Sequence, residues 1–539
     1  MTRTFLRTLA PAMAILLALC SSRLAFAQAG GAADAELVET RTEVPKLKAP
    51  AEYKPTGGVV DIELSEYAGY AGLIVANGGF EPSENSVFFK KHNFKLRIKL
   101  SEEESWSSLN AGRMAASATT VDVLAVYGRQ FDVTVPLLIG FSRGADGVVV
   151  RSDIKRINDL KGKTVAASQF TESDFFIRYL AQEAGVGVKM LADLSAKGDP
   201  EKINLVYCAD AFGAGDLFLR DLKAGKNRLA GCVTWAPKTT EVATDSGGKA
   251  AILVTNRNLL IVADVLVLNK AFAKANPDMV NGLIEGWLQG NQMVREQPDQ
   301  CAELIGKCFK WKPEKTKAEM AKVHLANLPE NLAFFSGTID AAGSYGYIFE
   351  TAGYVYGSEL IGKAADPDRF PDLAALKALD KSGQFKDQKI SIQPIRSDVK
   401  SAETPLGDLT PVLSKDIRFL FSPNSSKLDA AGADNNKGLD AISQILKVSP
   451  GARVLLRGHA DGSQIESFRK QGGEAKAREV RLTLKNLSKA RCEEIKNILQ
   501  DKFKLDAARI EFQGVGADEP TGKGPDADRR VEVQWFSVE

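Results

Sequence analysis

Histidine and cysteine most often hold metals or activate nucleophiles, and the histidines of this sequence are few and far apart. They are His92, His324 and His459. The sequence shows no clear pairing of a nucleophile with a base and no cluster of metal ligands. We therefore expect no catalytic residue, no metal site and no cofactor, and predict that the protein is not an enzyme. His459 is interpreted as a packing or hydrogen-bonding residue.

The triplet Gly162-Lys163-Thr164 has the residue types that end a phosphate-binding P-loop. That motif also needs a glycine five residues before its Gly-Lys pair. Position 157 is isoleucine, so the motif is absent. The triplet is interpreted as a turn into a strand.

Hydroxyl and aromatic side chains follow several predicted strands. In α/β sheets, ligands sit beyond the C-terminal strand ends, near helix N-termini. The segment 168–173 joins a strand to a helix, so its hydroxyls and free N–H groups suit an anion. We expect a small anionic or polar aromatic solute in a cleft formed by Tyr67, Tyr70, Ser168, Thr171, Ser173, Trp235 and Asp264.

Structural alternatives exist for three of these residues. Thr171 with Asp174 resembles a capping box, so Thr171 can serve as a helix cap. Trp235 can pack a hinge, and Asp264 can cap a strand end.

The elements that must position these residues belong to an exported chain of 539 residues, long enough for two or three domains. Arg3 and Arg7 precede an apolar run over 9–19, and Ala25-Phe26-Ala27 offers small residues for signal peptidase. We predict a signal peptide over 1–27, cleaved after Ala27. The alternative is a lipoprotein signal at Cys20, but Leu19 stands where a small residue is normally needed.

The charge balance bears on nucleic-acid binding, and the remaining cysteines bear on disulfide formation. Lys plus Arg number 70 and Asp plus Glu 68, so no concentrated basic surface for nucleic acid is expected. Cys301 and Cys308 lie seven positions apart in a helical pattern, about 10 Å, too far for a disulfide. Cys208 with Cys232 is the more plausible pair, and small buried hydrophobic residues are the alternative for most of the cysteines.

Composition divides the mature chain into four parts. Residues 28–56, rich in Ala, Gly, Glu and Pro, are predicted to form a flexible leader. Over 57–385, strands such as 59–64, 94–100, 147–150 and 164–166 alternate with helices such as 173–183, which predicts α/β structure with largely parallel sheets. Residues 386–411, with three prolines, read as a linker. Strands at 417–421, 453–457 and 530–535 and helices at 436–448 and 486–502 predict a small α+β domain over 412–539.

Five motifs occur over 412–539. They are Gly458-His459-Ala460-Asp461, Leu487-Ser488-Lys489-Ala490-Arg491, Gly514-Val515-Gly516 with Pro520, Asp528-Arg529-Arg530-Val531-Glu532, and Phe421 with Ser425 and Leu428. In residues and in order they resemble the OmpA-like peptidoglycan-binding domains. The resemblance implies that Asp461 and Arg491 bind the diaminopimelate of the peptide stem. The Asp461 carboxylate would pair with the ammonium of diaminopimelate, and the Arg491 guanidinium with its carboxylate. Arg529 and Arg530 are expected to divide ligand-facing and structural roles.

This segment departs from the family pattern in ways that put peptidoglycan affinity in doubt. Asp461 and Arg491 are 491 − 461 = 30 positions apart, about twice the family spacing. The charged stretch 468–476 accounts for the excess and is expected to be a surface loop or an added helical turn. The start of the 486–502 helix is expected to offer free N–H groups to an anion. Without the motifs, Asp461 would be taken for a turn cap and Arg491 for one half of a surface ion pair.

Six segments of 57–385 form a second ordered set. They are Tyr67-Ala68-Gly69-Tyr70, Leu109-Asn110-Ala111-Gly112-Arg113, 146–154, 159–166, Val233-Thr234-Trp235-Ala236-Pro237 and 263–268. This set resembles periplasmic solute-binding proteins of the sulfonate, nitrate and thiamine-precursor type. It implies an α/β two-lobed clamshell, meaning two lobes that close on a small molecule, with chain crossings near Asp146 and Leu260. The family often has Glu where Ala236 stands, which weakens any inference about the solute.

Together the two resemblances imply a solute-binding receptor of the importer type, tethered to peptidoglycan in the periplasm of a Gram-negative-type envelope. A membrane transporter as a further partner is left open. The alternatives are a structural envelope protein whose clamshell binds nothing, and a clamshell enzyme of the thiamine-precursor type.

Overall fold

The computed structural model describes residues 37–101, 105–339, 343–392, 405–422, 425–429, 432–449 and 451–536. The predicted signal peptide and both of its processing sites lie outside these residues. No helix within them is long and apolar enough to span a membrane.

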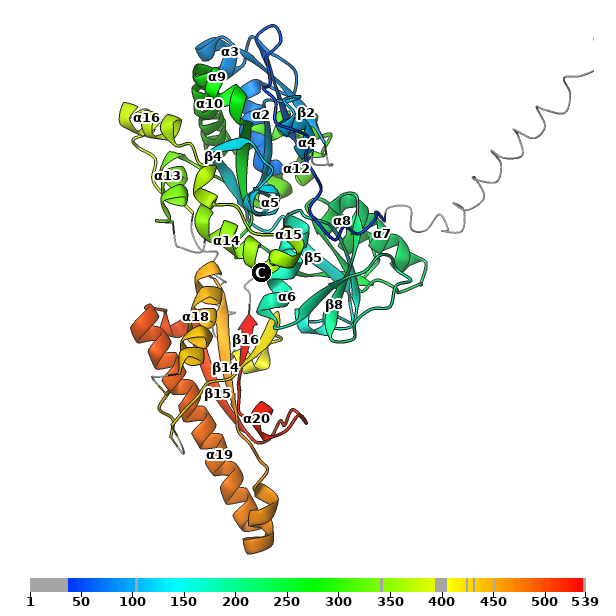
Figure 1. The fold of residues 1–539 in the computed structure, drawn as a ribbon, viewed down its shortest axis with the longest axis vertical. Coiled ribbons are helices and arrows are strands. Elements are labelled where there is room, and N and C mark those ends of the chain that lie inside the picture. Colours follow the sequence, from blue (N-terminus) through cyan, green and yellow to red (C-terminus); the bar gives the residue numbers. More distant parts are fainter. Residues whose placement is uncertain are drawn as a thin grey trace, which may run out of the picture.

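The N-terminal part folds into two α/β lobes, each built on a six-stranded sheet (Figure 1). In lobe 1 the strand order is β12 (Val323–Leu325), β4 (Val133–Ser142), β11 (Ala263–Asn269), β3 (Ala116–Thr120), β1 (Val59–Leu64) and β2 (Lys95–Leu100). In lobe 2 it is β10 (Ala250–Thr255), β5 (Asp146–Arg151), β9 (Gly231–Trp235), β6 (Thr164–Ser168), β8 (Lys202–Cys208) and β7 (Gly187–Met190). These sheets establish the two-lobed clamshell expected over 57–385.

Both sheets are mixed, and the expectation of largely parallel sheets was wrong. In lobe 1, β1 pairs in parallel with β2 and with β3. In lobe 2, β6 pairs in parallel with β8 and β9, and β8 pairs in parallel with β7. β11 runs antiparallel to β3 and β4, and β5 runs antiparallel to β9 and β10. The antiparallel strands are those where the chain leaves one lobe for the other, so the reversal follows from the crossings.

The chain passes between the lobes at two places, and Asn256 joins them. The first crossing lies between β4 and β5, and the second between β10 and β11. The buried Asn256 side chain accepts hydrogen bonds from Ser142 Oγ at 3.2 Å and Gly144 N at 2.9 Å, and its amide donates to Asp146 Oδ2 at 3.1 Å. The crossings expected near Asp146 and Leu260 are therefore present and are held side by side.

Helices cover the sheets on both lobes. They are α2 (Ala71–Asn77), α3 (Val87–His92), α4 (Trp106–Asn110), α5 (Val121–Tyr127), α6 (Glu172–Glu183), α7 (Ala211–Lys223), α8 (Lys238–Asp245), α9 (Lys270–Ala275), α10 (Pro277–Glu296), α11 (Pro298–Phe309), α12 (Pro313–Met320), α13 (Leu328–Ser336), α14 (Tyr345–Tyr356), α15 (Ser358–Ile361) and α16 (Ala374–Ser382). Short 3-10 turns include η1 (Ala68–Tyr70) and η2 (Ile157–Leu160). Trp287 on α10 and Phe88 on α3 are fully buried in the core of lobe 1.

In lobe 1, α2 and α10 approach each other so closely that only glycine fits between them. A Cβ on Gly290 would lie 1.9 Å from the backbone oxygen of Gly72, and one on Gly72 would lie 1.9 Å from Asn291 Oδ1. We expect Gly290→Ala to force the helices apart and to lower the free energy of unfolding by about 1–3 kcal/mol, as overpacking typically does. Urea denaturation monitored by circular dichroism measures the loss.

Gly346→Ala is the matched control, because Gly346 lies in α14 and a Cβ there meets no atom within 4 Å. That change is expected to be neutral or slightly stabilising, since alanine is the better helix former by about 1 kcal/mol. Equal stabilities of the two variants would contradict the close packing of α2 and α10.

The predicted flexible leader is an ordered strap over its described residues, 37–56. Val38 N donates to Tyr207 O of lobe 2 at 3.0 Å, and Ala51 N donates to Asn110 O of lobe 1 at 2.9 Å. Gln130 exchanges hydrogen bonds with Leu47 N and Pro45 O at 2.8 and 2.9 Å. Apolar side chains of the strap also pack against the lobes, among them the buried Tyr53 and the partly buried Val44 and Leu47, but they follow no regular period. The prediction of flexibility was therefore wrong for residues 37–56.

The five cysteines in the described residues form no disulfide. Cys208 ends β8 and Cys232 lies in β9, and β6 runs between these strands. Two strand spacings amount to about 9–10 Å, beyond the Cα separation that a disulfide spans. The suggested Cys208–Cys232 pair is therefore not formed.

The C-terminal domain is a four-stranded sheet covered by two helices. Its strand order is β13 (Leu413–Ile417), β16 (Val531–Phe536), β14 (Arg453–His459) and β15 (Ile510–Gly516), and its helices are α18 (Ala433–Val448), α19 (Ile465–Phe503) and the short α20 (Pro525–Asp528). The turns η5 (Leu406–Asp408) and η6 (Ala507–Arg509) precede β13 and β15. The small α+β architecture agrees with the prediction, although the first strand begins and ends four residues earlier than expected.

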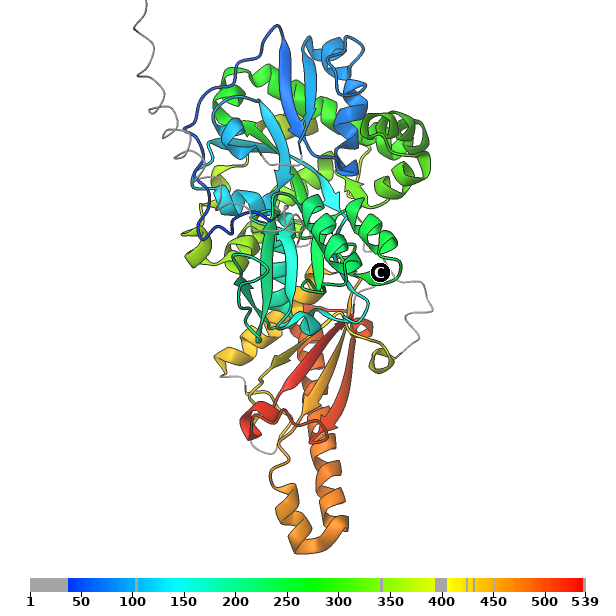
Figure 2. The same ribbon diagram turned by 90° about the vertical axis from the view of Figure 1, so that its right-hand side faces the viewer.

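The stretch expected to be a loop or an added turn is the tip of a helical hairpin. α19 breaks only at Gly472 and Gly473, where Gly473 has φ 68°, a conformation that favours glycine. Figure 2 shows the two arms projecting away from the sheet. Residue 486 therefore lies inside a helix, its N–H group is not free, and the expected anion site at a helix start there does not exist.

The C-terminal domain contacts lobe 2 and the second crossing. Asn158 of η2 exchanges two hydrogen bonds with the backbone of Ser414, both 2.8 Å, and Leu260 N donates to Val448 O at 3.2 Å. Tyr179 and Leu180 of α6 face the C-terminal domain in an apolar contact that also includes Leu259, Leu413, Ile445 and Trp535. α6 thus reaches from the cleft between the lobes to the C-terminal domain (Figure 1).

The two ends of the predicted linker are attached to the domains beside them. Ser391 N and Ile392 N donate to the buried Glu330 of lobe 1 at 2.8 and 2.9 Å. Leu406 packs against Leu455 and Phe536 of the C-terminal domain. Residues 393–404 lie outside the described residues.

Candidate functional sites

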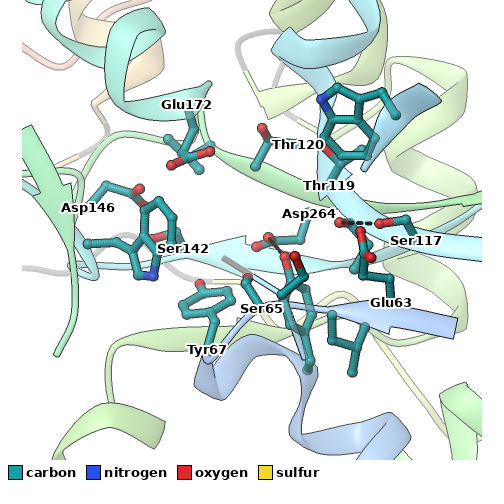
Figure 3. A pocket seen from close by; sticks show the side chains of 17 residues that line it. Glu63, Ser65, Tyr67, Ser117, Thr119, Thr120, Ser142, Asp146, Glu172 and Asp264 are labelled. Atoms are coloured by element: carbon teal, nitrogen blue, oxygen red, sulfur yellow. Dashed lines mark hydrogen bonds between the residues drawn. The ribbon is translucent and has the colours of Figure 1, made fainter. Parts of the chain in front are cut away.

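A cavity of about 60 Å³ lies between the two lobes (Figure 3). A single water needs about 10–15 Å³ on the same measure, so the space suits a small molecule. Lobe 1 contributes the ends of β1 and β3 and the turn η1, and lobe 2 contributes the start of β5, the end of β9 and the start of α6. The C-terminal ends of β1, β3 and β9 meet here, which brings together residues far apart in the sequence.

Four aromatic and four acidic side chains line this cavity. They are Tyr67, Tyr70, Trp106 and Trp235, with Glu63, Asp146, Glu172 and Asp264. Serine and threonine hydroxyls complete the polar lining, at Ser65, Ser101, Ser117, Thr119, Thr120 and Ser142. Among the described residues that line the cavity, none is lysine, arginine or histidine.

Burial and mutual repulsion disfavour the charges of these carboxylates. Burial raises the pKa of Asp264 well above its ordinary value, and the nearby charge of Asp146 raises it further, although the Tyr70 hydroxyl donates to Asp264 Oδ1 at 3.1 Å. Burial raises the pKa of Asp146 to about 6, against hydrogen bonds from Ser142 and Asn256. Burial likewise raises the pKa of Glu63, against hydrogen bonds from Ser105. The described lining of the cavity therefore holds four acidic groups and no basic one, and a positive charge entering the cavity would favour their ionised forms.

The structure places four of the seven predicted solute-site residues on this cavity: Tyr67, Tyr70, Trp235 and Asp264. Ser168, Thr171 and Ser173 are near its edge, but their side chains bond locally. Thr171 Oγ1 accepts from Ser173 N at 3.3 Å as the N-cap of α6, and Ser173 Oγ donates to Glu172 at 3.3 Å. Ser168 Oγ donates to Ala209 O at 3.4 Å.

Sequence reasoning missed Glu63, Asp146, Glu172 and Trp106 as lining residues. Asp146 carried a usable signal, because it marks the first chain crossing, and crossings border the cleft. Glu172 also carried one, since it directly follows the predicted cap Thr171. Trp106 carried none, because its approach to the cavity depends on how α4 packs against the sheet of lobe 1.

Behind the cavity, a buried ion pair fixes the start of α6. The Asp174 carboxylate accepts hydrogen bonds from Arg178 Nε at 2.7 Å, from the Tyr207 hydroxyl at 3.1 Å and from Phe170 N at 3.2 Å. Burial works against the charge of Arg178, but the Asp174 carboxylate outweighs it and holds the pKa of the guanidinium above its ordinary value. Arg178 is thus neutralised and takes no part in the lining.

A second cavity, of about 440 Å³, lies in the C-terminal domain. All four residues predicted to bind peptidoglycan line it: Asp461, Arg491, Arg529 and Arg530. Asp461 follows β14, Arg491 lies in α19, and the other two precede β16. The long hairpin accounts for the thirty-residue separation of Asp461 and Arg491 while leaving both on one cavity.

The charges in this second cavity are arranged for a zwitterion. Arg529 Nη2 donates to Asp461 Oδ2 at 3.1 Å. Burial opposes ionisation of Asp461, but hydrogen bonds from Ser463 and the charge of Arg529 outweigh it and hold the pKa of Asp461 below its ordinary value. Arg491 lies 4.8 Å over the Phe421 ring and donates through Nε to Ser425 O at 3.1 Å, so its remaining donors can face a ligand. Arg530 Nε lies 3.1 Å from Asp416, which assigns it a structural contact.

This domain carries a family signature as well as a cavity. Residues 420–533 match the OmpA family. The match includes all the motifs from Phe421 to Val533 and the whole of the second cavity's acidic and basic lining, apart from Arg418 at its rim. Comparison with curated proteins gives no match for the chain.

Solved structures similar to this chain are periplasmic binding proteins. The alkanesulfonate-binding protein SsuA from Xanthomonas axonopodis pv. citri, bound to MOPS, shares 13% identity over 57% of this chain and 97% of its own, with a TM-score of 0.43. The aliphatic sulphonate-binding protein SsuA from Escherichia coli shares 16% over 59% and 97%, with a TM-score of 0.43. The nitrate-binding protein NrtA from Synechocystis PCC 6803 shares 12% over 65% and 94%, with a TM-score of 0.45.

Proposed function

We propose that this protein is a solute-binding protein of the bacterial cell envelope, held non-covalently to peptidoglycan by its OmpA-family domain. One observation carries the proposal: a single chain joins a two-lobed clamshell with a cavity at its crossings to a domain whose own cavity gathers Asp461, Arg491 and Arg529. The first site suits a small solute, and the second suits diaminopimelate. The predicted signal peptide supports a periplasmic location for both.

The two cavities give the clamshell and the C-terminal domain separate binding roles. Closure of two lobes around a small molecule is a motion that two crossings permit, and it leaves the C-terminal domain free to hold the cell wall. Delivery to a membrane transporter of the importer type fits such a receptor. A binding role is preferred to catalysis because the cavity lining offers carboxylates, hydroxyls and aromatic rings, without a nucleophile paired to a base.

The alternative is a structural envelope protein with a clamshell that binds nothing. Unpaired buried groups argue against it. Asp264 Oδ2 and Thr119 Oγ1 are buried at the cavity and have no hydrogen-bond partner within the described part of the chain. Leaving such groups unpaired costs about 1–3 kcal/mol each, which a bound ligand can recover.

A thermal-shift screen of the full mature chain tests solute binding. The compounds are sulfonates, nitrate, phosphate, pyrimidines and amines, each with the parent and with Trp235→Ala. A true ligand at one hundred times its dissociation constant stabilises the folded state by about 2.7 kcal/mol. We expect at least one class to raise the melting temperature of the parent and to lose that effect in Trp235→Ala.

Two results would count against the solute-binding role. Absence of any shift across all classes would favour the structural protein. A shift that Trp235→Ala leaves intact would move the solute site away from the cavity between the lobes.

A further inference from the structure

We propose that the solute of the clamshell is a small organic cation carrying N–H groups, such as an amine or a guanidine, held by Asp146, Glu172 and Asp264. This proposal rests on the solute-binding function and specifies the class of solute. It replaces the anionic solute that the sequence suggested.

The first argument is the sign of the charge. Four carboxylates line the cavity, each on a residue less than a tenth exposed, and no basic residue among the described lining residues balances them. An anion would enter a field of like charge, and a cation would supply the missing counter-charge. Sulfonate and nitrate, the ligands named for the similar solved structures, are anions and would meet no guanidinium or ammonium here.

The anion site expected at the start of α6 is already occupied by the protein. Thr171 caps the helix, and Glu172 and Asp174 stand in its first turn, where carboxylates meet the positive end of the helix dipole. Asp174 also takes the hydrogen bond of Phe170 N at 3.2 Å. Glu172 projects into the cavity (Figure 3), so the segment presents a negative group to the solute.

The second argument is the kind of hydrogen bond that the cavity lacks. Asp264, 3% exposed, uses Oδ1 for the Tyr70 hydroxyl, and its Oδ2 is buried without a partner among the described residues. Figure 3 shows the Asp264 carboxylate at the centre of the lining side chains. When Asp264 is ionised, as a nearby positive charge favours, its oxygens are acceptors only and the missing partner is a donor such as N–H. Trp235 Nε1, also buried at the cavity and unpaired within the described part of the chain, is a donor, so the acceptor at Asp264 is decisive only together with the sign of the charge.

The third argument separates an organic cation from a metal ion. Within the described residues, the only three acidic, histidine or cysteine ligands that converge within 4.8 Å are His459, Glu519 and Glu532, in the C-terminal domain. The carboxylates of the cavity are therefore spread out. Spread carboxylates suit donors distributed over several atoms, and the four aromatic rings beside them favour an organic cation through their negative faces.

The pH dependence of binding follows from the groups that face the solute. These are Glu63, Asp146, Glu172 and Asp264, with Tyr67 and Tyr70 beside them, Asp122 behind Asp264, and Lys99 near Glu63. Burial raises the pKa of Asp146 to about 6 and that of Asp122 to about 7. Because a cation binds the ionised carboxylates, its affinity should rise as the pH passes from 5 to 8, and an anion would show the opposite trend.

The experiment is isothermal titration of the full mature chain at pH 5, 6.5 and 8 with 1,4-diaminobutane, agmatine, choline, taurine, nitrate and calcium chloride. The variants are Asp264→Asn and Asp146→Asn, which keep the size of the side chain and remove its charge. Asp245→Asn is the control, because Asp245 is an exposed acid at the end of α8, outside the cavity. Melting temperatures of all variants establish that each is folded.

We expect diaminobutane or agmatine to bind at pH 8, more weakly at pH 5, and about tenfold or more weakly to either cavity variant, with Asp245→Asn unchanged. Binding of taurine or nitrate that is lost in Trp235→Ala would contradict a cationic solute and leave the solute-binding role intact. Binding of choline without the amines would overturn the need for N–H groups, and binding of calcium lost in Asp264→Asn would overturn an organic solute. Failure of all six compounds would overturn this inference, and the receptor function would fall only if the thermal-shift screen also gave no shift.

Discussion

Replacing Asp174 with alanine is expected to lower the free energy of unfolding by about 3–5 kcal/mol, because it leaves the charge of Arg178 buried without a partner. Asp174 is fully buried and Arg178 is 8% exposed, with 2.7 Å between Oδ1 and Nε. The same carboxylate holds the Tyr207 hydroxyl and Phe170 N, so three contacts are lost at once. Urea denaturation of the full chain, followed by circular dichroism, measures the change.

Two further variants show whether the uncompensated charge is the cause. Asp245→Ala removes an exposed acid and should change stability by less than about 0.5 kcal/mol. The double variant Asp174→Ala with Arg178→Met removes both charges and should recover part of the loss. A loss below about 1 kcal/mol in Asp174→Ala would mean that the pair contributes little.

Peptidoglycan binding by the full mature chain should fall about ten- to a hundredfold in Asp461→Ala and in Arg491→Ala. Losing one partner of a charge-assisted contact costs roughly 1.5–3 kcal/mol, which corresponds to that range of affinity. Asp461 is the acidic residue that lines the cavity, and Arg491 is held over Phe421 with donors left for a carboxylate. Co-sedimentation with purified diaminopimelate-type peptidoglycan, over a range of protein concentrations, measures the affinity.

The controls come from the helices of the same domain. Arg478→Ala on the hairpin and Asp440→Ala on α18 remove exposed charges away from the cavity and should sediment like the parent. Parent-like sedimentation of both Asp461→Ala and Arg491→Ala would show that the OmpA-family cavity is not where the cell wall binds, even though the fold matches the family.

The contact between the C-terminal domain and α6 gives the two sites a shared structural support. α6 begins at the solute cavity with Glu172 and ends beside Leu413 and Trp535 of the C-terminal domain. The second crossing also meets that domain through Leu260 N and Val448 O. The C-terminal domain therefore contacts lobe 2 at α6 and the second crossing at Leu260.

Much of the fold was predictable from local patterns. Alternation of apolar and charged residues located β2 to within one residue, and the capping pattern of Thr171 with Asp174 after strand β6 located the start of α6 to within one residue. The ordered motifs of the C-terminal part placed Asp461 and Arg491 on one cavity despite their unusual spacing. The strap over 37–56 escaped prediction, because backbone hydrogen bonds to distant segments leave no periodic signal in the sequence.

The sequence by itself determined the α/β part and the small α+β domain, since both follow from residue types repeated along short stretches. The family resemblance implied the two lobes, and three of the four aromatic side chains of the cavity were predicted. Only the tertiary structure decided the charge of the cleft. Glu63, Asp146, Glu172 and Asp264 come from four elements up to 201 positions apart in number, and none of them is unusual in its own segment. The four carboxyl groups act on one another because the two lobes bring four strand and helix ends together and exclude water there. Burial and mutual repulsion therefore depend on the tertiary structure and not on any one segment.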